Sequence, residues 1–224
     1  MILTVGSTKG GVGKTTLAFN LTVTLAHAGQ DVLLIDGDEQ AHSMSFTELR
    51  SATREQGPGY TAQSLLGNQL RAVTGQVKKY RQVVIDVGGR DTSSFRNALL
   101  LSDLILVPTV PRTADIWGSI ATVDLVNLAR SSGNARLRAV GVINRADARG
   151  RDNSAALDEL KGIEGLEVSP VLIGDRKAYH NAMAKGLGIL EFKDHNDYYG
   201  VGKAQADFVQ LFNSLYPKLE RKIA

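Results

Sequence analysis

The sequence predicts an α/β fold in which a doubly wound, mainly parallel sheet is flanked by helices. Three observations lead to this prediction: short apolar runs alternate with helix-like stretches, the runs are apolar throughout, and most of them end in Gly, Asp, Asn or Pro. Strands that are apolar at every position are typical of a sheet buried on both faces. Their alternation with helices favours parallel strands joined by right-handed crossovers.

The expected elements succeed one another along most of the chain. The expected strands cover residues 2–5, 32–35, 83–87, 104–107, 139–143 and 168–173. The expected helices cover residues 14–28, 94–101, 113–130, 154–161 and 176–185. No shift in composition marks a linker, and 224 residues suit one α/β domain, so we expect a single domain over residues 1–224. In such sheets the ligand binds outside the carboxyl ends of the strands, where the unusual residues of this chain fall.

The composition narrows the classes of function. The chain has no cysteine, which excludes disulfides, thiolate metal sites and iron–sulfur clusters. A count of 26 Lys and Arg against 23 Asp and Glu gives a net charge of +3, which permits only a weak, sequence-independent attraction to phosphate backbones. Neither a bilayer-spanning apolar run nor a basic leader is visible, so we expect a cytoplasmic protein.

A glycine-rich segment, GSTKGGVGKTT at residues 6–16, lies between the first expected strand and the first expected helix. Glycines let the backbone turn its N–H groups inward, and the next helix presents its positive end, so the segment predicts a phosphate cradle. Lys14 would reach the β- and γ-phosphates, and the Thr15 hydroxyl would ligate Mg²⁺. Thr8 stands where GxxxxGK[ST] has its first glycine, and Lys9 adds a second lysine. The residues expected to bind nucleotide here are Lys9, Gly10, Gly11, Val12, Gly13, Lys14, Thr15 and Thr16.

Carboxylates follow two of the other expected strands. Asp36 and Asp38 come directly after residues 32–35, and two carboxylates at this spacing can orient one water on Mg²⁺ and another for attack on a phosphate. Asp86 lies at the end of the run 83–87 and is expected to hold a Mg²⁺-bound water. The glycines at 88 and 89 could let a backbone N–H approach the γ-phosphate. The alternative is that these aspartates only end strands at turns.

The run KGGVGKTT at residues 9–16 resembles the deviant Walker A box of the ParA/MinD ATPases. The resemblance implies a P-loop NTPase fold, ATP and Mg²⁺ as ligands, and an ATP-dependent homodimer in which Lys9 contacts the nucleotide of the partner subunit. It also implies that Asp38 positions the attacking water and that Asp36 lies closer to the metal shell. Glu39 replaces the usual proline of the family's D-x-D-P-Q box, which removes a rigid φ constraint. The implied catalytic residues are Lys9, Lys14, Asp38 and Asp86, and the implied metal-site residues are Thr15, Asp36, Asp38 and Asp86.

The second half of the chain carries weaker signals. By the same resemblance, Asn144 is expected to contact the adenine, with Asn as a simple turn former as the alternative. Pro170 and Arg176 are carried over to the same base-flanking region. Trp117, the only tryptophan, is either a dimer or partner contact or a core aromatic. The histidines show no metal-ligand spacing and receive no role; they are His27, His42, His180 and His195.

The last segment of the chain has apolar residues at helical spacing: Phe208, Leu211, Phe212, Leu215 and Leu219. A membrane anchor of the MinD kind would show such a stripe. A helix covering a sheet would show it as well, and Pro217 interrupts the pattern, so core packing is favoured. The cations considered for a DNA-facing patch are Lys193, Lys203, Lys218, Arg221 and Lys222.

The resemblance implies an ATPase with slow intrinsic turnover that acts as a dimeric switch. We expect its ATP-bound dimer to bind duplex DNA nonspecifically over the nucleoid, without stable membrane association. A centromere-binding or cargo-adaptor protein of ParB type would stimulate hydrolysis, and the cycle would partition or position a plasmid, a chromosome or another cargo. The chain begins at its first strand, so we expect the short ParA type. The alternatives are a membrane-cycling ATPase like MinD and a metabolic ligase of the dethiobiotin-synthetase type.

Overall fold

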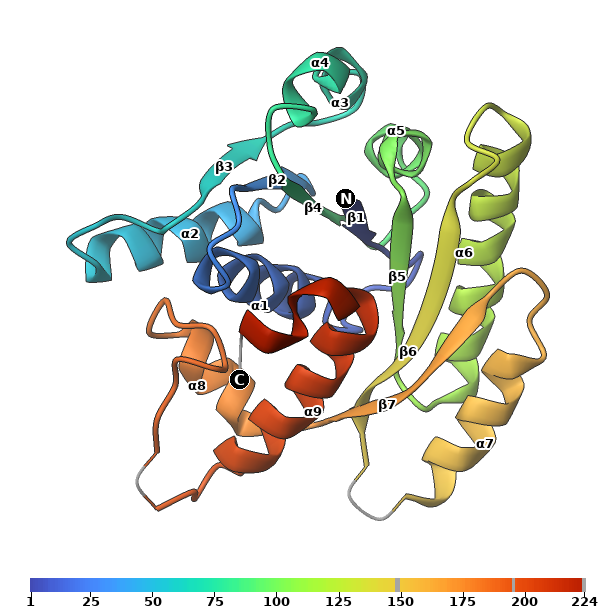
Figure 1. Ribbon diagram of the computed structural model, residues 1–224. Coiled ribbons are helices and arrows are strands. Elements are labelled where there is room, and N and C mark those ends of the chain that lie inside the picture. The colour runs from blue at the N-terminus through green and yellow to red at the C-terminus, as the bar shows by residue number, and fades with distance from the viewer. Residues whose placement is uncertain (148–149, 195, 223–224) are drawn as a thin grey trace.

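Seven parallel strands form one sheet in the computed structural model, which describes residues 1–147, 150–194 and 196–222 (Figure 1). In spatial order the strands are β3 (Thr61–Ser64), β2 (Val32–Gly37), β4 (Gln82–Val87), β1 (Ile2–Val5), β5 (Leu104–Thr109), β6 (Arg138–Ala146) and β7 (Glu167–Gly174). All six neighbouring pairs are parallel. The predicted doubly wound α/β fold is therefore confirmed.

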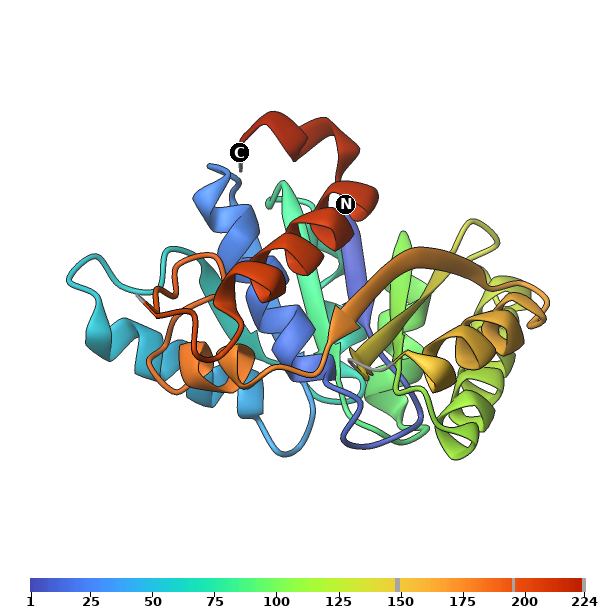
Figure 2. The same cartoon turned by 90° about the horizontal axis from the view of Figure 1, so that it is seen from below.

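Helices cover both faces of the sheet (Figures 1 and 2). The helices on one face are α1 (Lys14–His27), α8 (Lys177–Met183) and α9 (Val201–Leu215), with α2 (His42–Thr53) beside α1. Those on the other face are α3 (Gln69–Ala72), α4 (Thr74–Val77), α5 (Ser93–Leu101), α6 (Thr113–Ser131) and α7 (Arg151–Lys161). A 3₁₀ helix, η1 (Pro217–Lys222), follows α9.

The strands are apolar at every position because each one supplies side chains to two cores. In β2, Val32 and Leu34 pack into the core on the α1 side, and Leu33 and Ile35 pack into the core on the α6 side. This division follows from the period of two along a strand. None of the described helices is long and apolar enough to cross a membrane.

The sequence reasoning missed β3, α2 and the one-turn helices α3 and α4. Strand β3 has the sequence Thr-Ala-Gln-Ser, and it is only partly buried because it lies at the sheet edge. Helix α2 buries only Ser43, Thr47 and Arg50, all of them polar, so it carries no apolar stripe. A prediction based on apolar runs finds neither β3 nor α2.

The C-terminal helix ends at Leu215, before Pro217, which begins η1. The side chains of Phe208, Leu211 and Phe212 are fully buried against the sheet, as expected for a helix that covers a core. The apolar stripe is thus occupied by packing within the chain.

The carboxyl ends of the central strands bring the unusual residues together. Strand β1 pairs with both β4 and β5, and its last residue, Val5, is level with Asp86. On the other side of β4, Asp36 is level with Asp86 as well. Residues 50 positions apart in sequence therefore become neighbours beside the segment that follows β1.

Candidate active site

The segment after β1 forms a tight loop around the start of α1. Gly11 and Gly13 adopt φ values of +76° and +90°, a left-handed conformation that costs a side-chain-bearing residue free energy. No side chain caps the first turn of α1, so its free N–H groups point out of the helix at the loop. A helix N-terminus of this kind binds anions such as phosphate.

Lys14 lies within this loop. Its side chain is 8% exposed, and its Nζ donates a hydrogen bond of 2.7 Å to the backbone carbonyl of Lys9. Burial lowers the pKa of Lys14, while the carboxylates of Asp86 and Asp38 oppose that shift. A phosphate bound beside the ammonium would supply the negative charge that favours its protonated form.

Asp86 is buried beside the first turn of α1 and does not itself line the cleft beside the phosphate loop. Its Oδ2 accepts hydrogen bonds from Thr15 Oγ1 at 2.7 Å and from Ser43 Oγ at 2.8 Å. Burial raises the pKa of Asp86 to about 7. A buried carboxylate ringed by hydroxyl groups fits a hydrated Mg²⁺ ion, which prefers oxygen ligands. In the part of the chain that the structure describes, no group of three or more His, Asp or Glu could hold a metal ion by itself.

Asp36 and Asp38 have different environments. Asp36 is fully buried, and its carboxylate accepts hydrogen bonds from the N–H groups of Asp38 (3.1 Å) and Met44 (2.9 Å). Burial raises the pKa of Asp36. Asp38 is half-buried and lines this cleft, which runs from the phosphate loop towards α2 and α8. Its Oδ1 accepts a hydrogen bond from the N–H of Gln40 at 3.1 Å. Asp36 therefore holds the loop together, and Asp38 faces the site.

The loops after β2 and β4 both lie close to the phosphate loop. A Cβ on Gly89 would lie 2.9 Å from the backbone N of Gly10, so only glycine allows this approach. A Cβ on Gly88 would lie 3.2 Å from Asp38 Oδ1. Glu39, at the position where the family box has proline, is exposed, and Ala41 nearby adopts φ +50°. The left-handed backbone at a non-glycine residue adds local strain to this loop.

Helix α6 supports the start of the phosphate loop, a contact that the sequence reasoning missed. Thr8 Oγ1 donates a hydrogen bond of 2.9 Å to the carbonyl of Gly118, and the Thr8 N–H donates to Thr122 Oγ1 at 3.0 Å. The aliphatic stem of Lys9 lies against Gly118, where an added Cβ would collide with it. Thr8, at the position where the pattern has glycine, thus anchors the loop to α6.

Asn144 holds the phosphate loop from behind. It is 5% exposed, and its Nδ2 donates a hydrogen bond of 2.7 Å to the carbonyl of Val12. A Cβ on Gly13 would collide with the same amide group. Asn144 lines the cleft, but its amide is engaged with the loop backbone in this structure.

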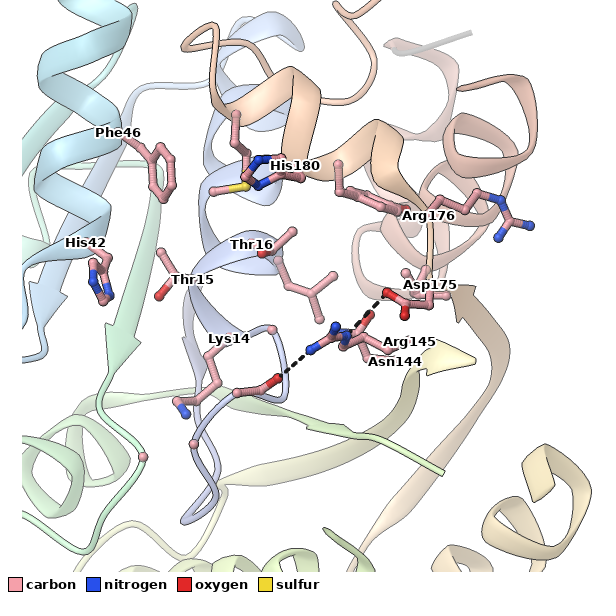
Figure 3. A pocket seen from close by; sticks show the side chains of 18 of the residues that line it. Lys14, Thr15, Thr16, His42, Phe46, Asn144, Arg145, Asp175, Arg176 and His180 are labelled. Carbon is pink, nitrogen blue, oxygen red and sulfur yellow. Dashed lines mark hydrogen bonds and ion pairs between the residues drawn. The ribbon is translucent and has the colours of Figure 1, made fainter. Parts of the chain in front are cut away.

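Arg145, which the sequence reasoning passed over, spans the cleft from the end of β6. It adopts φ +54°, and its guanidinium donates to the carbonyl of Gly11 (3.2 Å) and to Asp175 Oδ1 (3.3 Å) (Figure 3). Arg176 also lines the cleft and pairs with Asp207 at 3.2 Å. Arg145 directly follows the candidate residue Asn144 in sequence, and this position could have drawn attention to it.

Pro170, which was also predicted to flank the base, does not line the cleft. It is an exposed residue within β7, four positions before the strand ends. In its place, the carboxyl end of β7 supplies Ile173 and Gly174. Arg176, which was predicted together with Pro170, does line the cleft.

The cleft has a volume of about 490 Å³ and continues beyond the phosphate loop between α2 and α8 (Figure 3). The side chains that line this extension were given no role from the sequence; they are His42, Phe46, Tyr179, His180 and Met183. His42 and His180 come from opposite walls. His27 instead bonds Glu191 at 2.6 Å, and His195 lies outside the described residues.

A family model described as "CobQ/CobB/MinD/ParA nucleotide binding domain" matches residues 3–189. The chain belongs to this family. The resemblance drawn from residues 9–16 is thereby confirmed, and the family is one of P-loop NTPases that hydrolyse ATP.

Individual relatives cover nearly the whole chain. The maintenance of carboxysome distribution protein A of Halothiobacillus neapolitanus is 25% identical over 96% of both chains. A protein ParA of Rhizobium radiobacter is 23% identical over 96% of this chain and 97% of its own. The structure of a Cyanothece McdA–ATP complex superposes with a TM-score of 0.77 at 18% identity, covering 96% of each chain, which supports the fold.

Proposed function

We propose that this protein is an ATP-driven dimeric switch that positions DNA or another large cargo. The observation that carries the proposal is the placement of Lys9, whose stem lies on α6 while Lys14 occupies the phosphate loop. Among the described residues, the Lys9 ammonium has no hydrogen-bond or ion-pair partner. A cation presented beside the loop, but not used within it, can neutralise the phosphates of a nucleotide bound by a second copy.

The chain's own residues would divide the chemistry in the following way. The phosphate loop and Lys14 bind the phosphates of ATP, and Thr15 with Asp86 holds Mg²⁺, which supplies charge neutralisation when bound. Asp38, which faces the cleft, orients the attacking water. Asp36 fixes the loop that carries Asp38 through two backbone hydrogen bonds. Because Lys9 completes each site only in the dimer, hydrolysis by an isolated chain is slow.

The dimer binds random duplex DNA, and a cargo-bound adaptor stimulates hydrolysis and releases it. The net charge of +3 and the exposed side chains of Lys193, Lys203 and Lys218 support a weak attraction to phosphate backbones. The side chains of Arg221 and Lys222 lie outside the described part. The name of one relative supports a carboxysome-like protein assembly as the cargo, and DNA as the cargo rests on the resemblance to the ParA/MinD family. We propose a cytoplasmic, nucleoid-associated location and one domain over residues 1–224.

The two alternatives have less support. A membrane cycle would need a free amphipathic helix, but the apolar stripe of α9 is buried against the sheet. A metabolic ligase would have no use for Lys9 beside the loop. Liposome co-sedimentation with ATP tests the first alternative, and ATP turnover that depends on a small acid or amine tests the second.

The test is binding to random duplex DNA with ATP and with ADP, measured by electrophoretic shift. We expect binding only with ATP, loss of binding in Lys9→Ala, and preserved or stronger binding in Asp38→Ala. Lys79→Ala removes an exposed lysine remote from the loop and serves as the matched control. No DNA binding in any nucleotide state would contradict the proposal.

The placement of Lys9 has a geometric test. In Gly118→Ala the new Cβ would collide with the Lys9 stem and displace it, so we expect weaker ATP-dependent dimerisation, measured by light scattering. Gly75→Ala is the matched control, because a Cβ at Gly75 meets nothing within 4 Å. Equal dimerisation of the two variants would show that the path of Lys9 over α6 is irrelevant.

A further inference from the structure

A groove of about 560 Å³ lies between α6 and α7, which run side by side at one edge of the molecule (Figure 1). None of the residues that line it belongs to the nucleotide cleft. Its apolar lining includes Trp117, which is 66% exposed, and Ile120, which is 45% exposed. Large apolar side chains gathered at an exposed groove are typical of interaction sites.

Helix α6 has two apolar faces, and only one of them is needed for the core. Ile116, Val123 and Val126 are buried against the sheet side. Trp117 and Ile120 recur at helical spacing on the outer surface, and Leu128 extends this surface by two turns at 47% exposure. A helix that only covers a sheet needs a single apolar stripe, so the outer apolar stripe indicates contact with a partner.

The groove is also acidic. Asp124, Glu159 and Glu164 line it, and no lysine, arginine or histidine does. Within the described residues, none of these three carboxylates forms an ion pair. The whole chain has a net charge of +3, so this negative charge is local, and it favours an occupant that carries positive charge.

We propose that the α6–α7 groove binds a basic amphipathic helix of a partner protein. Apolar side chains of that helix would cover Trp117 and Ile120, and its Lys or Arg residues would pair with the three carboxylates. The role of this partner as the adaptor that controls hydrolysis rests on the proposed function, whereas its recognition by the groove does not.

Other occupants fit the groove less well. A second copy in a two-fold contact would bring identical surfaces together and place like carboxylates opposite one another. Duplex DNA and anionic membranes carry the same sign of charge as the groove rim. Only a cationic, partly apolar segment satisfies both features.

The groove is connected to the phosphate loop by direct contacts. Gly118, next to Trp117 in α6, accepts the hydrogen bond of Thr8 and lies against the stem of Lys9. A helix bound over Trp117 therefore presses on the segment of α6 that supports the loop. Through these contacts the partner can shift Lys9 and change the rate of hydrolysis.

Trp117 reports on this groove without a label, because it is the only tryptophan. The probe is a synthetic helical peptide of about 18 residues, with Leu at i, i+3, i+4 and i+7 and Lys at the other positions. Its counterpart carries Glu in place of Lys. We expect the Lys peptide to shift the Trp117 emission to shorter wavelength in a saturable titration, and the Glu peptide to leave it unchanged.

Two variants locate the binding. Ile120→Lys keeps Trp117 and should weaken the Lys peptide more than about tenfold, because Ile120 is a central apolar contact. The triple variant Asp124→Lys, Glu159→Lys and Glu164→Lys should reverse the preference between the two peptides. Tyr198→Ala removes an 81% exposed aromatic outside the groove and should change nothing.

Equal responses to the two peptides, or a preference that the triple variant leaves intact, would overturn the proposal. So would an emission shift that appears with ATP alone, grows with protein concentration and is lost in Ile120→Lys, since the occupant would then be a second copy. ATP-dependent DNA binding is measured on the same samples. If wild type fails to bind DNA but keeps its peptide preference, only the proposed switch function fails.

Discussion

The two ends of the nucleotide cleft are built differently. At the phosphate end, Lys14, Thr15 and Asp86 come from segments that directly follow or end the adjacent strands β1 and β4. At the base end, the lining comes from β6, β7, α2 and α8. The first end is built from the loop between β1 and α1 and the end of the neighbouring strand β4, and the second from the packing of four elements.

The two ends also use their polar side chains differently. At the phosphate end, the side chains of Asp38 and Lys14 line the cleft and bond to the backbone of their own loops, at Gln40 and Lys9 respectively. Asn144 and Arg176 at the base end bond to residues of other segments, Val12 and Asp207 respectively. We infer that the phosphate end selects a polyphosphate with Mg²⁺, and that the base end stiffens the loop more than it recognises the base. Variants at each end can break or sharpen this distinction.

The largest effect is expected at Lys14. Lys14→Ala removes the cation within the phosphate loop, and we expect ATP hydrolysis to fall by about 10³-fold, the scale of losing one charge-stabilising donor. ATP and GTP binding should weaken alike, because the proposed role of the lysine is to bind the phosphates and not the base. Fluorescent-nucleotide titration measures both, with Lys79→Ala as the control. Retained hydrolysis would place the reaction elsewhere.

Asp86→Asn should have the next largest effect, on stability. Burial raises the pKa of Asp86 to about 7, above the unfolded value of 3.8, so the folded chain holds a proton that it loses as the pH rises towards 7. Below pH 3.8 this group makes its full contribution to the free energy of unfolding. As the pH rises from 3.8 to above 7, the free energy of unfolding falls by up to about 4 kcal/mol. In urea unfolding without nucleotide, we expect the free energy of unfolding of Asp86→Asn, relative to that of wild type, to rise between pH 5 and pH 8. A gain that is constant with pH would contradict this.

A smaller effect is expected at Asn144. Asn144→Ala removes the hydrogen bond to Val12 behind the phosphate loop, at a cost of about 1–2 kcal/mol, or roughly fivefold to thirtyfold in nucleotide affinity. The ratio of ATP to GTP affinity should stay the same, since the amide acts on the loop and not on the base. Asn127→Ala, on α6, is the control. A changed ratio would restore Asn144 as a base contact, as the sequence predicted.

The smallest effect is expected at Arg176. Its ion pair with Asp207 joins side chains that are about a quarter exposed, so Arg176→Ala should cost less than about 1 kcal/mol. Unlike Asn144→Ala, it should alter the ratio of ATP to GTP affinity, because Arg176 lines the base end. The same titration measures this, and Lys177→Ala is the control. An unchanged ratio would mean that neither residue reads the base.

Sequence reasoning predicted the sheet and the phosphate end because both depend on local patterns. An apolar run predicts a buried strand, and the residues after it are placed by the strand's end. It failed for β3, which is polar, and for α2, which has no apolar stripe. It also missed Ser43, Arg145 and Gly118, because their partners lie 43 to 134 positions away along the chain. Contacts of that kind depend on the packed structure and leave no local pattern.

The most direct test of the proposed dimeric switch is to mix Lys9→Ala with Lys14→Ala. Neither variant should hydrolyse ATP alone, since the first lacks the cation from the partner and the second lacks its own. In a mixed dimer, Lys9 of the Lys14→Ala chain completes the nucleotide site of the other chain. We expect an equal mixture to recover up to about a quarter of wild-type ATPase activity, because half of the dimers are mixed and each has one working site. No recovery, with both variants folded, would show that Lys9 does not act across a dimer.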